Sequence, residues 1–175
     1  ELKDVIDRAP VYLGTLVADA PANIGDGWRN ELQLSLSSPL DGIGLPLSML
    51  KAQVTFRKTE VTDPTTGKPR QISAIQTYGP PPAIQAVRES EWELHYTQDL
   101  PKLRTTWGVD IMGPYIDRYF RLSEIETQKV ETWIVVYGEW KWRPDLSARV
   151  EVQAPLPRDV VRVRDVWSGP RSTFG

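Results

Sequence analysis

The chain has no cysteine and only one histidine, His95, among its 175 residues. Without cysteine there can be no disulfide bond, no thiolate metal site and no cysteine nucleophile. A single histidine also excludes a histidine-rich metal site, so we predict neither a metal ion nor a cofactor. His95 lies between Leu94 and Tyr96 in a strand-like run, and we interpret it as an ordinary strand residue.

The chain also lacks a dominant sign of charge and a long apolar run. It has 21 basic and 23 acidic residues, which gives no reason to expect a nucleic-acid partner. No window approaches the ~18 apolar residues that indicate a transmembrane helix. The first residues, ELKDVIDRAP, show neither a signal peptide nor an initiator Met, so we expect a processed chain or part of a larger protein.

Apolar and polar residues alternate with a period of two in ELQLSLS, KAQVTFR, EWELHYTQ and LSARVEVQ. Strict alternation predicts strands with one apolar and one polar face. No segment shows a helical period, although residues 123–130 could take a helical turn. We therefore predict an all-β chain of antiparallel strands with almost no helix. The expected strands lie near residues 28–38, 49–61, 90–99, 102–122, 131–143 and 145–154.

The connectors between these strands differ in length. Residues 99–102 (DLPK) and 143–145 (RPD) predict tight turns, whereas residues 61–88 are long and rich in proline. Alternating short and long connectors are typical of an antiparallel up-and-down meander. We expect 61–88 to be an exposed, mobile connector that contributes no side chain to the core, with Lys68 and Arg70 at its solvated tip.

The Gly67–Lys68 pair within this connector does not form a phosphate-binding P-loop. Thr62 stands where that motif needs its first glycine, and Pro69 stands where it needs serine or threonine. We expect Gly67 to adopt a positive φ in a turn that begins at Asp63.

Two architectures fit the alternation. A soluble sandwich or barrel would bury the apolar faces, whereas a transmembrane barrel would turn them toward lipid and its polar faces toward a lumen. The period alone does not separate these alternatives. Seven tryptophans and six tyrosines occur against three phenylalanines, and Trp and Tyr are enriched at membrane boundaries.

Five segments carry a resemblance to a known family: NIGDGWRNELQLSLSSPLDGIGL, VTDPTTGKPRQIS, TQDLPKLRTTWGVD, YFRLSEIET and RPDLSARVEVQ. Their order and spacing over about residues 21–169 resemble the C-terminal barrel of TonB-dependent outer-membrane receptors of alphaproteobacterial type. The resemblance implies that the chain is a segment of a transmembrane β-barrel in the cell outer membrane. It also implies a receptor that binds and imports a ligand such as a siderophore, a vitamin or an oligosaccharide.

The resemblance further implies three partners: outer-membrane lipid, the remainder of the barrel, and the TonB complex, which acts through a plug domain. No plug domain is visible in this sequence. The residues after RVEVQ read APLPRD, so the closing strands also look absent. We therefore expect residues 1–175 to form one partial β-barrel domain, without plug and closing strands.

We assign no residue a catalytic role. Charged residues on the lumen side would pair with a plug or line the ligand path, and the alternative is that they are simply wetted interior positions. These candidates are Asp110, Arg121, Glu139, Arg149 and Glu151.

Two other functions fit parts of the sequence. A soluble β-rich module could bind a ligand or carbohydrate by stacking it on Trp and Tyr. The carboxylate pairs Glu124/Glu126 and Glu89/Glu91 could indicate glycoside hydrolysis. Charged pairs are common on wet strand faces, however, so we predict that the chain is not an enzyme.

Overall fold

The computed structural model describes residues 1–73, 88–153 and 159–173, and the predicted all-β, antiparallel fold is confirmed over these ranges. The helices within them are three short 3-10 turns, none long and apolar enough to cross a membrane. Half of the predicted mobile connector 61–88, residues 74–87, lies outside the described residues.

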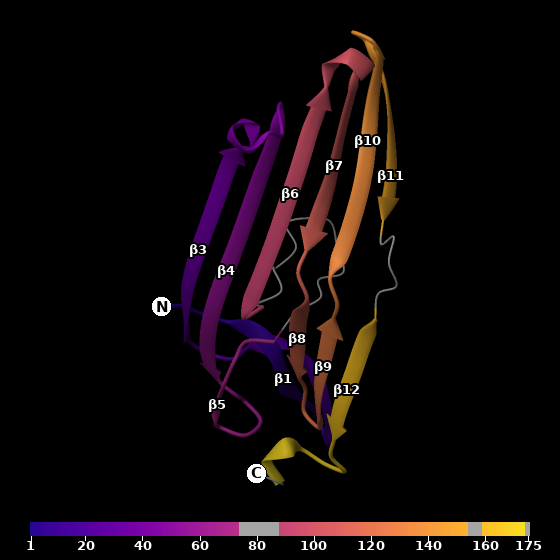
Figure 1. Ribbon diagram of the computed structural model, residues 1–175. Coiled ribbons are helices and arrows are strands. Elements are labelled where there is room, and N and C mark those ends of the chain that lie inside the picture. The colour runs from indigo at the N-terminus through magenta and orange to yellow at the C-terminus, as the bar shows by residue number, and fades with distance from the viewer. Residues whose placement is uncertain (74–87, 154–158, 174–175) are drawn as a thin grey trace.

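Most of the long strands form one sheet, which we call the main sheet (Figure 1). The spatial order is β3-β4-β6-β7-β10-β11, and every neighbouring pair is antiparallel. A two-residue strand, β5 (Pro69–Arg70), also pairs with β4. The bounds of the others are β3 (Gly27–Pro39), β4 (Ser48–Thr62), β6 (Ser90–Leu100), β7 (Thr105–Met112), β10 (Trp133–Arg143) and β11 (Leu146–Gln153).

The short connectors of the main sheet lie together at one end, which we call the turn end (Figure 1). They are η1 (Asp41–Ile43), η2 (Pro101–Leu103) and residues 144–145. The 3-10 turns η1 and η2 each end on a residue in the left-handed conformation, Gly44 with φ 86° and Arg104 with φ 52°. The tight turns predicted at 99–102 and 143–145 are confirmed. We call the opposite end the loop end.

A second, three-stranded sheet lies at the loop end in the order β12-β9-β8. Its strands are β8 (Tyr115–Phe120), β9 (Glu124–Val130) and β12 (Val160–Val166). The helical turn considered for 123–130 is therefore wrong, because these residues form β9. The sequence pattern also failed to predict β12, since the expected strands ended near residue 154.

The single strand predicted at 102–122 is wrong, because it breaks between β7 and β8 at Gly113 and Pro114. Proline cannot donate a ladder hydrogen bond. A Cβ on Gly113 would lie 2.2 Å from the ring of Trp92, so only glycine fits at this position next to the ring. Pairing resumes in the same register beyond the break, with Met112 opposite Trp133 and Tyr115 opposite Val130.

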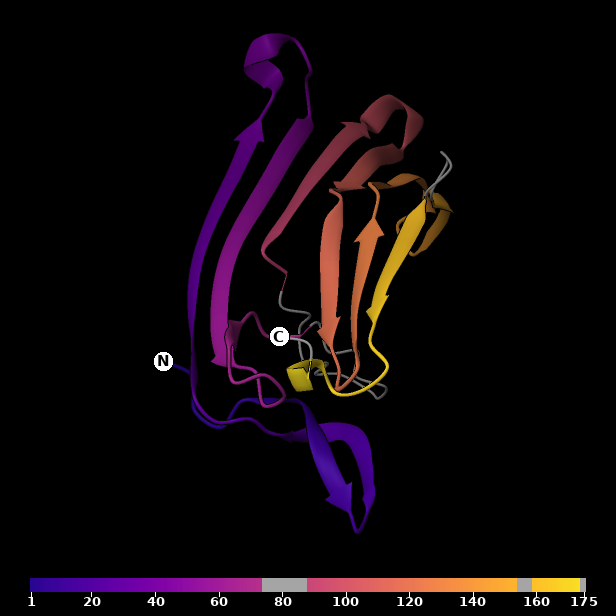
Figure 2. The same cartoon turned by 90° about the horizontal axis from the view of Figure 1, so that it is seen from below.

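A hairpin that the sequence did not predict precedes the main sheet. It consists of β1 (Ile6–Leu13) and β2 (Leu16–Asn23), joined at Gly14 with φ 66°. Seen from the loop end, the hairpin extends away from the main sheet, and the larger strands follow an arc (Figure 2).

The hydrophobic core is small and lies at the loop end. Val5, Val61 and Ile72 form a buried cluster against which Leu2 and Ile24 pack. Ile72 falls in the segment expected to contribute no core side chain, so that prediction is wrong. Among the described residues, more polar or charged side chains than apolar ones are buried.

Gly108→Ala should destabilise the main sheet. The new Cβ would lie 2.5 Å from the carbonyl oxygen of Tyr96 and from the ring of Tyr137, a clash that backbone atoms cannot relieve. We expect a loss of about 1–3 kcal/mol in the free energy of unfolding. Gly138→Ala on the neighbouring strand is the control, since nothing lies within 4 Å of its Cβ. Equal unfolding midpoints for the two variants would contradict the register.

Candidate functional site

The main sheet has two chemically distinct faces, because cross-strand partners point to the same side. One face, which we call the apolar face, carries rows of apolar side chains. The two central rows are Leu36–Ala52–Leu94–Ile111–Ile134 and Leu50–Tyr96–Val109–Val136–Val152. No residue in these rows is among the buried residues of the described chain.

The exposed fractions of these side chains agree with a face on which the described residues pack no core. Leu34, Val136 and Val150 are 54%, 36% and 69% exposed, and Val54 and Leu94 are half-buried. The apolar face therefore presents a broad hydrophobic surface. Surfaces of this kind mark sites of contact with protein, membrane or ligand.

The opposite face, which we call the polar face, carries four of the five predicted site residues. Glu139 lies opposite Arg149, and Arg149 Nη2 is 3.2 Å from Glu151 Oε2. Asp110 lies on the same face, in the row of His95. Arg121 does not join them, because it lies between β8 and β9 at the loop end.

A cavity of about 710 Å³ lies over the middle of the polar face, lined by Lys51, Gln53, Glu93, His95, Asp110 and Tyr137 among others. The ring of His95 lies between two carboxylates, with Nδ1 2.9 Å from Asp110 Oδ1 and Nε2 3.5 Å from Glu93 Oε2. The side chains that line the cavity include hydrogen-bond donors and acceptors, and they include both basic and acidic groups. It suits hydrogen bonding to a polar ligand or protein surface.

Sequence reasoning interpreted His95 as an ordinary strand residue and did not predict its contacts with Glu93 and Asp110. Alternation placed the residue on the polar face, but only the pairing of β6 with β7 brings Asp110 opposite it. Tyr137 was missed for a similar reason. Its ring lies over Gly108, and the Arg149 guanidinium lies 4.0 Å from the ring centroid.

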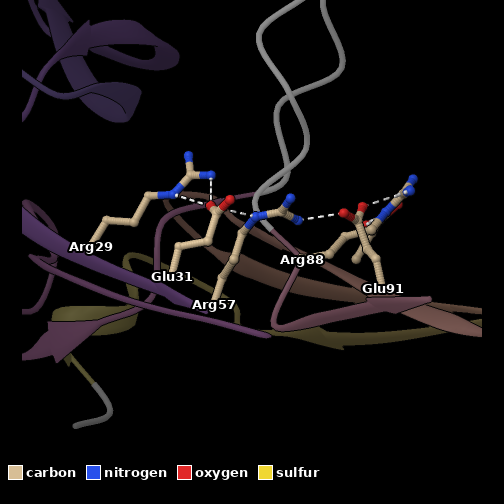
Figure 3. Close-up of polar contacts among 6 residues, drawn as sticks. Arg29, Glu31, Arg57, Arg88 and Glu91 are labelled. Atoms are coloured by element: carbon tan, nitrogen blue, oxygen red, sulfur yellow. Dashed lines mark hydrogen bonds and ion pairs between the residues drawn. The ribbon is translucent and has the colours of Figure 1, made fainter. Parts of the chain in front are cut away.

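A row of alternating charges crosses the polar face toward the loop end, and we call it the charge ladder (Figure 3). Its members in order are Arg29, Glu31, Arg57, Glu91, Arg88 and Asp117. Arg57 bridges Glu31 and Glu91, and Arg88 bridges Glu91 and Asp117. Because three cations alternate with three carboxylates, the ladder is neutral and its members satisfy one another.

A second charge cluster, which we call the clasp, is buried at the loop end. It consists of Asp7, Asp63, Arg70 and Arg171, whose side chains are at most 7% exposed. Arg70 Nη1 lies 2.8 Å from Asp7 Oδ2, and Arg171 Nη1 lies 2.7 Å from Asp63 Oδ2. Both guanidinium groups also approach the ring of Phe120. The clasp therefore joins β1, the segment after β4, β8 and the C-terminal turn.

The turn at Asp63–Lys68 positions the clasp. The Thr65 N–H donates to the Asp63 carboxylate at 2.9 Å, and the Gly67 N–H donates to the Asp63 carbonyl at 2.8 Å. Gly67 has φ 69°, as predicted. Lys68 is exposed, but the prediction of a solvated Arg70 is wrong, because that side chain is only 6% exposed.

Hydrogen bonds set the charge state of the clasp. Burial alone would raise the pKa of Asp63, but the Arg171 guanidinium and the Thr65 N–H outweigh it and leave the pKa below its usual range. Asp63 therefore stays ionised and keeps its ion pair with Arg171 at neutral pH.

The Glu124 and Glu126 carboxylates are both buried and each is paired with an arginine of β12. Hydrogen bonds from Arg164 lower the pKa of Glu124. Burial alone would raise the pKa of Glu126, but Arg162 and Gln128 outweigh it and the pKa is lowered. A glycosidase needs one carboxyl group with a raised pKa as its general acid. This pair gives no support to that chemistry.

Arg70→Met should loosen the loop end, because it leaves Asp7 buried without its counter-ion. Breaking a buried pair in this way costs about 3–5 kcal/mol. The amides of Arg8 and Ser73 both donate to the Asp7 carboxylate, so we expect their hydrogen exchange to accelerate most. Lys68→Met, two residues away and exposed, should change neither rate. Unchanged exchange at Ser73 in Arg70→Met would contradict the clasp.

Glu124→Gln should make the protein less sensitive to acid. The folded-state pKa of Glu124 lies below its ordinary value of 4.5, so ionised Glu124 stabilises the fold above that pH. This stabilisation is lost as the pH falls through the folded-state pKa. The variant should be less stable at neutral pH and show a shallower decline in unfolding midpoint below about pH 5. Glu89→Gln, at an exposed position, is the control.

No protein-family model matches the chain, and neither the curated proteins nor the solved structures contain a significant match. The features of the chain that bear on its function are therefore the two faces of the main sheet, the charge ladder and the clasp.

Proposed function

We propose that the chain forms part of the β-barrel wall of a TonB-dependent outer-membrane receptor. The apolar face of the main sheet would contact lipid, and the polar face would line the lumen. The observation that carries the proposal is the exposed apolar face, which continues across all six long strands and on which the described residues form no core. Lipid-facing and lumen-facing residues alternate in this way in transmembrane barrels.

Strand length and connectors support the same proposal. Strands β6 and β10 have 11 residues each, and a tilted membrane-crossing strand needs about 9–11. Outer-membrane barrels have short turns on the periplasmic side and longer loops outside. The turn end would then face the periplasm and the loop end the exterior.

The edges of the main sheet indicate where further strands would join. Among the described strands, β3 and β11 each have one neighbour in this sheet. Open edges in lipid would leave backbone groups without hydrogen bonds, at a high energetic cost. The remainder of the barrel would supply the missing neighbours on both sides.

In this arrangement Asp110, Glu139, Arg149 and Glu151 line the lumen, and Arg121 lies near its outer opening. A ligand such as a siderophore, a vitamin or an oligosaccharide would pass this face, and the TonB complex would act through a plug domain. The cavity beside His95 provides polar groups for either the plug or the ligand. None of these residues performs covalent chemistry in the proposed role.

Single cysteines can test the proposal, because the chain has none of its own. We would place an environment-sensitive fluorophore at Leu34→Cys or Leu94→Cys on the apolar face, and at Ser35→Cys or Glu93→Cys beside them on the polar face. After reconstitution into vesicles, labels on the apolar face should shift to shorter wavelength and be quenched by lipids with brominated acyl chains. Labels on the polar face should respond instead to a water-soluble quencher.

The soluble binding module makes the opposite prediction. Its apolar-face labels would be shielded by protein, without lipid, in a detergent-free monomer. Brominated lipid would not quench any of the four labels, and that result would reject the barrel wall.

A further inference from the structure

Two neighbouring segments, one in the turn after β6 and the other at the end of β10, share a basic–apolar–basic pattern: Lys102-Leu103-Arg104 and Lys141-Trp142-Arg143. The pairing of β7 with β10 brings them side by side at the turn end. The Lys141 N–H donates to the Arg104 carbonyl at 2.8 Å, and Arg104 Nη1 donates to the Trp142 carbonyl at 3.2 Å. We call these two tripeptides the paired turns.

The apolar members of the paired turns lie at the border of the apolar face. Trp142 is 57% exposed and its ring stacks on Trp140, with centroids 5.4 Å apart. Leu103 is 64% exposed. Exposed tryptophans in this position are typical of the boundary between apolar and aqueous phases.

One of the basic members, Arg143, lies at the same border. Arg143 is opposite Leu146, so it shares the apolar face and marks its end. Arg104 adopts φ 52°, a conformation that costs energy for a residue other than glycine. Its N–H donates to Pro101 and its side chain crosses to the second turn, so the guanidinium is held between the two turns.

The local charge balance favours an anion. Of the nearby acidic residues, Asp99 and Glu139 lie on the polar face, as does Lys141. The sequence of the two tripeptides and the turn that follows Arg143 contains one further acidic residue, Asp145, which the cations Lys102, Arg104 and Arg143 outnumber. The third turn, between β3 and β4, carries Asp41 and no basic residue, so the pattern is not a general property of the turn end.

We propose that the paired turns bind the phosphate group of an anionic phospholipid, with its acyl chains along Trp140 and Trp142. Guanidinium groups match phosphate geometry and can bind it through two hydrogen bonds. This inference rests on the proposed function, because it requires the apolar face to be in lipid. It adds to the proposed function the class of lipid that binds, the site that holds its headgroup and the side of the membrane on which that site lies.

The test uses the chain reconstituted in vesicles that contain equal amounts of phosphatidylglycerol and phosphatidylethanolamine. After extraction in mild detergent, native mass spectrometry counts the lipids of each class that remain bound. We expect phosphatidylglycerol to be enriched about tenfold, since basic residues at an anionic surface each contribute measurably to binding. The enrichment should fall to near parity in the double variant Arg104→Gln, Arg143→Gln.

A second double variant, Lys102→Gln, Arg143→Gln, keeps Arg104 and its hydrogen bond to Trp142, and should also lose most of the enrichment. The control Lys68→Gln, Lys129→Gln removes two exposed cations at the loop end and should retain it.

Each remaining outcome has a distinct meaning. Insertion with equal retention of the two lipids would overturn this inference and leave the barrel wall intact. Enrichment that persists in both double variants, or that is lost equally in the control, would also overturn the site. In vesicles that hold the unmodified fold, a lack of quenching by brominated lipid at the apolar-face labels would reject the proposed function and this inference together.

Discussion

The cross-strand register of the main sheet determines the character of both its faces. Because side chains alternate along each strand, a slip of one residue on any strand would place polar groups among Leu36, Leu94 and Ile134. Every pair from β3 to β11 keeps apolar residues opposite apolar residues in the central rows. The register shift between Lys141 and Arg143 lies at the turn end, beyond these rows. A consistent register thus gives a single sheet one face suited to an apolar environment and one face suited to water.

Buried ion pairs connect the segments of the loop end, where the hydrophobic core is small. Exposed pairs such as Lys3–Glu1 contribute at most about 1 kcal/mol, whereas removing one partner of a buried pair costs about 3–5 kcal/mol. The clasp is of the second kind, because its side chains are nearly inaccessible to solvent. It joins segments that no strand pairing connects. The charge ladder serves the neighbouring strands of the polar face in a similar way.

Alternation in the sequence was sufficient to predict most strands of the main sheet and the apolar and polar faces of those strands. It predicted that Asp110 and Glu139 share the polar face, since parity along a strand is a local property. It could not predict the clasp, because Asp7 and Arg70 are 63 residues apart and a charged side chain beside a turn looks solvated. It also missed the break at Pro114, where the alternation runs on but the backbone loses a donor. Burial of charge depends on partners that a local pattern does not contain.

The difference between the two faces bears on what must cover the main sheet. The charges of the polar face largely satisfy one another, as in the ladder and in the contacts of His95, so this face tolerates water. The apolar face requires a cover, and a protein cover would need side chains complementary to every row from β3 to β11. A bilayer needs no such complementarity, because fluid acyl chains conform to any apolar surface of suitable height. Lipid is therefore the simplest cover for this face, and a headgroup site at the paired turns would fix where that cover ends.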